Sequence, residues 1–263
     1  MTDIASGVTP VMRYHWDNRG WVQESAQAAV EMPVTLFVNG AEYVTAALTP
    51  LDLEDWAIGY LAGDGAIDRA ERVTIFQWRP EDGQIWLRIP GFHPSSTGGS
   101  RYLGSCCGQS RPGFFNPVGL APLDTPLALD PAVIRAHFDV LSSWTHGQHS
   151  GGLHAAALAL GSDLQWLRCD VGRHNALDKV FGAALRAGQH DLTQAVVYFS
   201  GRLSAEILWK VRQMGAAAVV SNAAPTSLGV QMANQLGITA VGFVRDNEMS
   251  VYSHPQRLGL KDS

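Results

Sequence analysis

The sequence predicts an α/β fold, α+β overall, in which a β-rich N-terminal part precedes an α/β C-terminal domain. Two hairpin-like pairs of strands occupy much of the first half, whereas strands alternate with helices in the second half. With 46% hydrophobic and 16% charged residues, the 263-residue chain has enough apolar side chains to build a core. We place the boundary near residue 125, so the expected domains are 1–125 and 126–263.

Turn signals and apolar runs define the elements of the N-terminal part. Residues 32–48 are predicted as a hairpin, because Asn39-Gly40 is a strong two-residue turn signal between β-type runs. A helix is expected over 51–63, with acidic residues near its start. A second hairpin is expected over 72–90, where turn residues separate aromatic and β-branched runs. Residues 1–30 are polar and mixed, and we expect an irregular N-terminal segment.

Capping residues and helical periodicity define the elements of the C-terminal domain. Residues 130–147 are predicted as a helix that Asp130 caps, with Pro131 in its first turn. An amphipathic helix is expected over 175–188. The other predicted elements are strands at 153–160, 164–170, 195–200, 216–220, 238–243 and 249–253, and helices at 204–215 and 226–237. Because these strands alternate with helices, a mainly parallel sheet is expected.

Charge and composition exclude several classes of protein. The net charge of −5 argues against nucleic-acid binding, which usually needs a basic face. No apolar run approaches the roughly 18–20 residues that cross a bilayer, so no membrane insertion is expected. The first residues lack the basic and apolar regions of a signal peptide. Three cysteines, two of them adjacent, do not make a disulfide framework. We therefore expect a cytoplasmic protein.

The adjacent Cys106 and Cys107 lie within 94–113, a long stretch rich in glycine and serine that we expect to be a loop. A disulfide between neighbouring cysteines would close a strained ring, so a structural crosslink is not expected. A zinc site would need further ligands, and no second cysteine pair with suitable spacing is present. The candidates that could complete such a site are Cys169, His154 and His174.

Two interpretations of the cysteine pair remain open. The pair could be buried and inert, since free cysteine behaves as a small hydrophobic residue. The neighbouring glycines and serines make a poor core, however, and Arg101 and Arg111 could lower a thiol pKa and favour a nucleophilic thiolate. Such a thiolate on a loop could take up sulfane sulfur at one place and deliver it at another.

A second candidate site lies in 169–179 (CDVGRHNALDK), where a strand is expected to turn into a helix. The free N–H groups and positive dipole of a helix start favour anions. The alternative is an ordinary turn with a capping asparagine. Similar small polar residues occur at other strand–helix junctions, at 150–156, 199–202 and 222–228. Since ligands of open α/β sheets collect at the carboxyl edge of the strands, a phosphate-bearing ligand is expected there.

From about residue 30 onward the chain resembles the FdhD/NarQ family of formate dehydrogenase accessory sulfurtransferases. The motifs that carry the resemblance are PVTLFVNG, TPLDLEDWAIGYLAGDGAI, SCCGQSR, GGLHAAAL, DVGRHNALDKVFG, SGRLSAEILWK, APTSLGVQMA and GFVRDNEMSVYSHPQRL. The resemblance implies a cytidine-deaminase-like fold for the second domain. The deaminase zinc signature H-x-E…P-C-x-x-C is absent, because Ala155-Ala156 follows His154 and Thr226 follows Pro225. Neither deamination nor a bound metal is expected.

The resemblance also implies a function. Family members take sulfur from a cysteine desulfurase as a cysteine persulfide. They pass it to bis-molybdopterin guanine dinucleotide, the molybdenum cofactor that then serves formate dehydrogenase. A homodimer is expected on the same ground. Two other functions remain open: a cofactor-binding chaperone whose thiols do not turn over, and a nucleotide-dependent hydrolase, for which these motifs lack a base–nucleophile pair.

The family motifs point to individual residues of this chain. Many members carry Cys-Gly-x-Cys with the persulfide on the first cysteine. Aligning the Cys-Gly step assigns the persulfide to Cys107, puts Ser110 in place of the second cysteine and leaves Cys106 as an auxiliary thiol. The stretch associated with the molybdenum cofactor matches Phe243, Val244, Arg245, Asp246, Asn247 and Glu248, of which Arg245 is the phosphate candidate. From the physics of the helix start, we expect the guanine nucleotide or pyrophosphate to contact Gly172, Arg173, His174 and Asn175.

Overall fold

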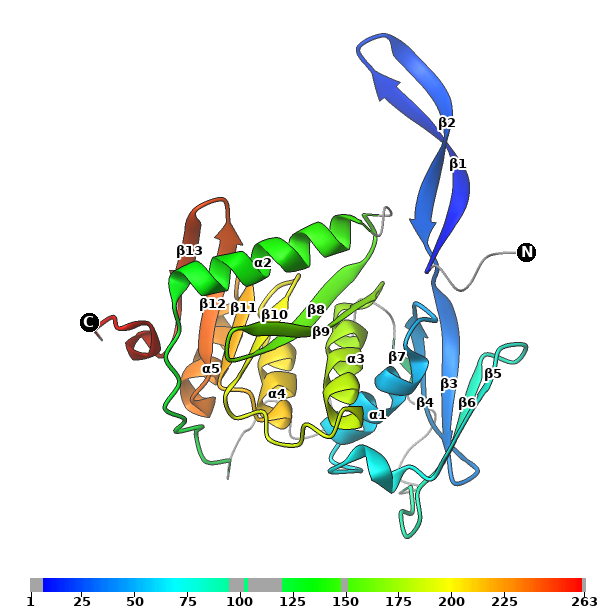
Figure 1. Ribbon diagram of the computed structural model, residues 1–263. Helices are drawn as coiled ribbons and strands as arrows, with labels where there is room; N and C mark the ends of the chain where they lie inside the picture. Colours follow the sequence, from blue (N-terminus) through cyan, green and yellow to red (C-terminus); the bar gives the residue numbers. More distant parts are fainter. Residues whose placement is uncertain (1–6, 95–101, 104–119, 148–150, 262–263) are drawn as a thin grey trace.

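The computed structural model describes residues 7–94, 102–103, 120–147 and 151–261 (Figure 1). These residues form three sheets, of two, five and six strands. The α/β fold class is therefore confirmed. Cys106 and Cys107 lie outside the described residues, as does nearly all of the expected loop 94–113.

The five-stranded sheet belongs to the N-terminal part and has the order β5-β6-β3-β4-β7. Its strands are β3 (Met32–Val38), β4 (Ala41–Leu48), β5 (Ile75–Arg79), β6 (Gln84–Arg88) and the two-residue β7 (Tyr102–Leu103). Both expected hairpins are confirmed. In the β3–β4 turn Asn39 and Gly40 have φ angles of 51° and 89°, the left-handed values that such a two-residue turn requires.

The six-stranded sheet has the order β13-β12-β11-β10-β8-β9. Its strands are β8 (His154–Leu160), β9 (Asp163–Asp170), β10 (Ala195–Phe199), β11 (Ala218–Ser221), β12 (Thr239–Arg245) and β13 (Glu248–Val251). The expectation of a mainly parallel sheet is wrong, because only β10–β11 and β11–β12 pair in parallel. The β8–β9 and β12–β13 connections are two-residue turns, which join only antiparallel strands, whereas helices bridge the parallel pairs.

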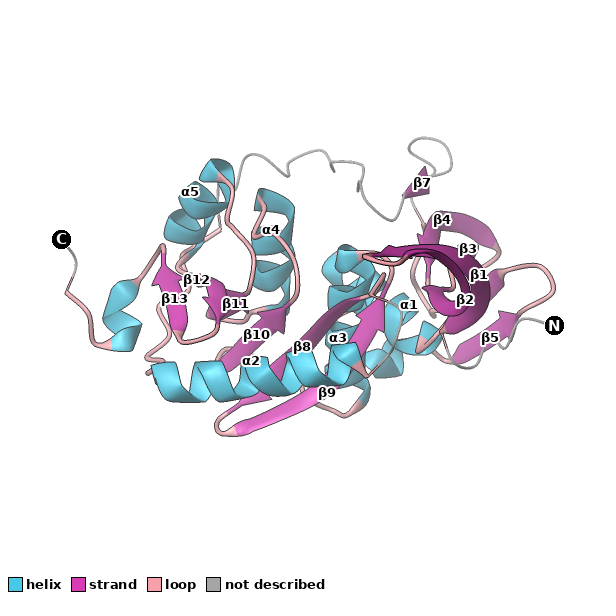
Figure 2. Cartoon of the chain, turned by 90° about the horizontal axis from the view of Figure 1, so that it is seen from above, coloured by secondary structure: helices cyan, strands magenta, loops and turns pink. Residues whose placement is uncertain are grey.

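Helices cover both faces of this sheet (Figure 2). On one face lies α2 (Pro131–His146), whose Ile134, Phe138 and Leu141 pack on β8, β10 and β11. On the other face lie α3 (Arg173–Arg186), α4 (Ala205–Met214) and α5 (Ser227–Leu236). Asp130 caps α2 as expected, accepting a hydrogen bond from the Ala132 amide at 2.8 Å. Short 3₁₀ turns occur at Ala70–Arg72 and Pro255–Leu258.

The two halves of the chain meet where α1 (Leu53–Gly63) crosses α3. Their backbones approach so closely that a Cβ on Gly59 would lie 1.8 Å from the Asp178 carbonyl oxygen, and one on Gly182 would lie 1.8 Å from that of Asp55. One hydrophobic cluster extends from the five-stranded sheet through both helices to the six-stranded sheet. The two sheets thus share a core, and the domain boundary near residue 125 stays a prediction.

The N-terminal segment differs from the irregular structure expected for 1–30. Within it, β1 (Val8–Asp17) and β2 (Gly20–Ala29) pair over their full length as an antiparallel hairpin. Their residues are mostly exposed on both faces, so burial imposes no hydrophobic alternation that could have indicated strands. Across the part of the chain that the structure describes, no helix is long and apolar enough to cross a membrane.

Candidate functional site

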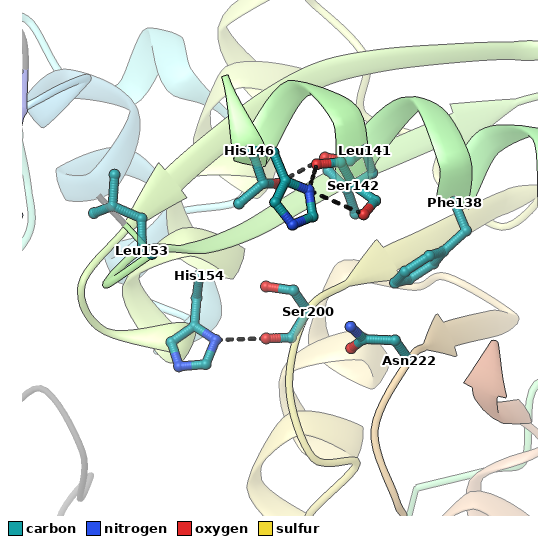
Figure 3. Close-up of a pocket in the computed structure, with 10 residues that line it drawn as sticks. Phe138, Leu141, Ser142, His146, Leu153, His154, Ser200 and Asn222 are labelled. Atoms are coloured by element: carbon teal, nitrogen blue, oxygen red, sulfur yellow. Dashed lines mark hydrogen bonds between the residues drawn. The ribbon is translucent and has the colours of Figure 1, made fainter. Parts of the chain in front are cut away.

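A cavity of about 510 Å³ opens at the carboxyl edge of β10 and β11, beneath the C-terminal half of α2 (Figure 3). Ser200 and Asn222 directly follow these two strands, and His154 begins the antiparallel neighbour β8 at the same edge. The described residues that line it are Phe138, Leu141, Ser142, Thr145, His146, Gly151, Leu153, His154, Ser200 and Asn222. It combines apolar surface with neutral polar groups, as small-molecule sites usually do.

His154 has a defined tautomer in this cavity. Its Nδ1 is hydrogen-bonded to the carbonyl oxygen of Ser200. Because a carbonyl oxygen can only accept a hydrogen bond, Nδ1 carries the hydrogen and is the donor. In a neutral ring Nε2 then keeps its lone pair and can accept a hydrogen bond from a ligand. The hydroxyl of Ser200 accepts from the Ala155 amide at 2.7 Å, which leaves its own hydrogen to donate.

The amide of Asn222 supplies both a donor and an acceptor on the same side of the cavity (Figure 3). Among the described lining residues there is no lysine, arginine, aspartate or glutamate. A neutral ring with several hydrogen-bonding groups, such as a nucleobase, therefore suits this cavity better than a phosphate does.

The stretch 243–248 continues the same edge from the next strand. The amide of Phe243 donates to the Ala223 carbonyl at 3.3 Å, so the end of β12 lies beside the residue that follows Asn222. The backbone here is irregular, because Phe243 has a φ of 54° and the β12–β13 register shifts between Gly242 and Arg245. The guanidinium of Arg245 is exposed and lies 5.8 Å from the centre of the Phe243 ring.

The other residues of this stretch have different surroundings. Val244 is buried in the core beneath α2. Asn247 accepts a hydrogen bond from Arg135 of α2, which ties the β12–β13 turn to that helix. Asp246 and Glu248 are exposed. A ligand at this edge could therefore contact the side chains of Phe243 and Arg245, whereas Val244 has a packing role.

The turn before α3 also lies at this edge, because His154 of β8 pairs with Asp170 at the end of β9. Gly172 and Asn175, two of its four predicted contact residues, form hydrogen bonds within the protein. The Gly172 amide donates to Asp170 Oδ1 at 2.7 Å. The buried Asn175 donates to the Ala47 carbonyl and to Asp170, at 3.0 and 3.1 Å. The helix begins at Arg173, so Asn175 lies inside it and does not cap it, contrary to the alternative considered for this turn.

Arg173 and His174, in the first turn of α3, are half-buried. His174 Nε2 lies 3.0 Å from a carboxylate oxygen of Glu206 on α4. Burial lowers the pKa of His174 from its usual value, and the hydrogen bond to Glu206 opposes this only in part. The same hydrogen bond lowers the pKa of Glu206. Arg173 and His174 are thus less buried than Gly172 and Asn175, although only 14% of the His174 side chain is exposed.

Beneath this turn, polar groups that the core encloses hold the two halves of the chain together. Lys179 Nζ lies 2.7 Å from Asp170 Oδ2 and donates to the Thr49 carbonyl at 2.8 Å. Asp170 in turn accepts from the Thr49 amide at 3.0 Å. The neighbouring Cys169 is buried, and desolvation raises its pKa to about 11. This thiol is therefore not a nucleophile at neutral pH.

The sheet edge thus gathers Arg245, the cavity and the turn before α3. Sequence reasoning identified the loops at 150–156, 199–202 and 222–228 but did not select Ser200 or Asn222 as ligand contacts, and considered His154 only for zinc. The position of Ser200 and Asn222 directly after a strand was the available signal. Which of the small polar residues in these loops face a cavity, however, depends on how α2 covers the edge of the sheet.

Comparison with known proteins agrees with this architecture. The sequence profile of the FdhD/NarQ family matches residues 29–259. A sulfur carrier protein FdhD from Geobacillus kaustophilus is 35% identical over 270 residues, which cover 98% of this chain and 99% of the relative. Another sulfur carrier protein FdhD, from Shouchella clausii, is 40% identical over 243 residues, and the aligned region covers 89% of this chain and 90% of that relative.

A solved structure extends the likeness to three dimensions. The crystal structure of a protein described as a formate dehydrogenase accessory protein, from Desulfotalea psychrophila, superposes with a TM-score of 0.77 at 25% identity. The match covers 95% of this chain and 99% of the other. By sequence and by fold, this chain belongs to the FdhD/NarQ family.

Proposed function

We propose that this chain is a sulfur carrier that serves the maturation of formate dehydrogenase. The observation that carries the proposal is the nearly full-length similarity to proteins named sulfur carrier protein FdhD. The adjacent thiols Cys106 and Cys107 provide a group that can hold sulfur, whereas Cys169 is buried with a raised pKa.

In the proposed reaction the Cys107 thiolate attacks the outer sulfur of a persulfide on a cysteine desulfurase. The bond between that sulfur and the desulfurase cysteine breaks, the desulfurase leaves as a thiolate, and a new S–S bond forms on Cys107. The molybdenum cofactor would be the substrate that accepts the outer sulfur: the S–S bond on Cys107 breaks, a reduced molybdenum centre supplies the two electrons that convert the sulfane sulfur to sulfide, and Cys107 is released as a thiolate. Cys106 is the auxiliary thiol in this scheme.

We further propose that the cofactor binds along the carboxyl edge of the six-stranded sheet. A guanine ring suits the neutral cavity, where His154, Ser200 and Asn222 offer hydrogen bonds. Phosphates suit Arg245 on one side and Arg173 on the other. Arg245 ends β12, and Arg173 lies in the first turn of α3, just after the end of β9. The ends of these two strands are four strand spacings, or about 19 Å, apart, a distance that suits an elongated dinucleotide.

Titration with GDP tests the placement of the cofactor. Asn222→Ala removes hydrogen bonds to the base and should weaken binding about fivefold for each one lost, since one hydrogen bond contributes on the order of 1 kcal/mol. The matched control is Asn234→Ala, an exposed asparagine on α5 whose side chain bonds the Val230 carbonyl within its own helix. Equal loss in both variants, or no binding of GDP by the wild-type protein, contradicts the placement.

A maturation assay tests the role of the thiols. In cells without their own accessory protein, Cys107→Ala should abolish formate dehydrogenase activity, whereas Cys169→Ser should retain it. If Cys106→Ala abolishes activity and Cys107→Ala does not, the persulfide belongs to Cys106. If both single variants and the double variant support full activity, a chaperone role without sulfur turnover replaces the proposal.

A further inference from the structure

The loop that follows β10 carries an arginine to which no role has yet been assigned. It contains the sequence FSGR at 199–202, one of the strand–helix junctions rich in small polar residues. Ser200 lines the cavity, whereas Arg202 lies two residues further along the chain and is exposed. Within the described part of the chain, the Arg202 side chain forms neither a hydrogen bond nor an ion pair. Its guanidinium is therefore available to a ligand.

This loop passes around the edge of the six-stranded sheet from one face to the other. The cavity lies beneath α2 on one face, whereas α4, which begins at Ala205, covers the opposite face (Figure 2). Residues 200–204 therefore lead from the cavity to the start of α4. Two residues span at most about 7 Å of extended backbone, so the Cα atom of Arg202 lies within that distance of the Cα atom of Ser200. An arginine thus stands beside the cavity without lining it.

The backbone that carries Arg202 is fixed on both sides. The carbonyl oxygen of Gly201 accepts a hydrogen bond from Ser221 Oγ at 2.6 Å. The carbonyl oxygen of Leu203 accepts from the Thr226 amide at 3.0 Å. Gly201 and Leu203 are buried, whereas Arg202 between them is exposed. Because this backbone is already ordered, a ligand that binds Arg202 needs to order only the side chain, which lowers the entropic cost of binding.

The charges around this loop favour an anionic group. The described lining of the cavity has no arginine or lysine, so a nucleotide whose base lies there has to place its phosphates outside, beside a cation. A guanidinium matches phosphate oxygens with two parallel hydrogen bonds. The adjoining start of α4 carries the positive end of the helix dipole, and the Ser204 side chain forms no capping bond there. The acidic residue of this first turn, Glu206, is already paired with His174 at 3.0 Å.

We propose that Arg202 binds the phosphate groups of the nucleotide whose base occupies the cavity. The inference rests on the proposed cofactor site and gives that site a direction: the base lies beneath α2, and the phosphates follow residues 200–204 toward α4. Arg202 follows β10, which lies between β12, where Arg245 is, and β9, which Arg173 follows. Arg202 thus supplies a cation in the middle of the sheet edge, and the site should prefer a nucleoside diphosphate to the nucleoside alone.

Calorimetric titration with GDP and, separately, with guanosine tests the proposal. Arg202→Met should weaken GDP binding about tenfold or more, because a hydrogen bond to a charged group is stronger than a neutral one, and should leave guanosine binding unchanged. Arg202→Lys should keep part of the GDP affinity, since an ammonium retains the charge but not the planar fork. The matched control is Arg88→Met, which removes an exposed arginine from β6 of the other sheet and should bind both ligands as the wild type does.

The Asn222→Ala variant separates this inference from the cofactor placement on which it rests. Asn222→Ala should weaken GDP and guanosine alike, because it acts on the base. If the wild-type protein binds neither ligand, the cofactor placement fails, and the role of Arg202 fails with it. If Asn222→Ala weakens both ligands but Arg202→Met binds GDP as well as Arg88→Met does, the placement stands and the inference about Arg202 is overturned. An equal loss of GDP and guanosine in Arg202→Met also overturns it, since guanosine has no phosphate.

Discussion

Lys179 and Asp170, both fully buried, form an ion pair of 2.7 Å between α3 and the end of β9. Lys179 also bonds the carbonyl oxygens of Thr49 and Cys169, so each of its three ammonium hydrogens has an acceptor. The motif 169–179, which sequence reasoning singled out as an anion site, therefore also joins the N-terminal part of the chain to the C-terminal sheet.

Lys179→Met should destabilise the protein by about 3–5 kcal/mol, because it leaves the Asp170 carboxylate buried without its cation. Urea unfolding followed by circular dichroism measures this. Arg13→Met is the matched control, since its partner Glu24 and Arg13 itself are exposed, and it should cost no more than about 1 kcal/mol. Similar losses of unfolding free energy in the two variants would show that the Lys179–Asp170 pair does not hold the two halves of the chain together.

Gly59→Ala should destabilise the fold by more than about 4 kcal/mol, because the new methyl group would lie 1.8 Å from the Asp178 carbonyl oxygen and push α1 off α3. Gly63→Ala on the same helix is the control. Its methyl group would meet no atom closer than 3.8 Å, and alanine is the better helix former. Thermal unfolding of both variants should give a lower midpoint for Gly59→Ala only; equal midpoints would refute the close crossing.

Cys169 should resist alkylation by iodoacetamide at neutral pH in the folded protein. Its pKa is raised to about 11 by burial, so the reactive thiolate is scarce, and the thiol is also shielded from the reagent. Peptide mass spectrometry after labelling, with and without urea, measures the modified fraction. Labelling of Cys169 in the native protein as fast as in urea would contradict its position in the core.

His174 should make the stability of the protein fall as the pH drops below about 6.5, its usual pKa. Burial lowers its folded pKa, so the unfolded chain binds the proton more readily and acidification favours unfolding. The pKa of Glu206 is also lowered on folding, but its contribution to the stability of the protein is lost only at lower pH, below about 4.5. His174→Gln should flatten the stability profile just below pH 6.5 in urea titrations, and an unchanged slope would argue against the assignment.

Local signals predicted much of the fold. The Asn39-Gly40 turn and the Asp130 cap are determined by neighbouring residues, and both are present in the structure. The mixed sheet was missed because the alternation of strands and helices does not reveal which connections are tight turns. The β1–β2 hairpin was missed because no core imposes a pattern on its residues.

The candidate site was predicted only in part, for a physical reason. Gly172 and Asn175 occur at a helix start, where anions often bind, but Asn175 bonds the carbonyl of Ala47, 128 residues away in sequence. Such contacts depend on how α1 packs against α3. The cavity at Ser200 and Asn222 likewise exists because α2 covers the sheet edge, which no local motif encodes.

Mass spectrometry of the intact protein, after incubation with a cysteine desulfurase and cysteine, tests the proposed sulfur carriage most directly. The wild-type chain and Cys169→Ser should gain the mass of one sulfur atom, which a thiol reductant then removes. Cys107→Ala should gain none. A wild-type protein that gains no sulfur, or a Cys107→Ala protein that gains as much as the wild type, would contradict sulfur carriage on Cys107.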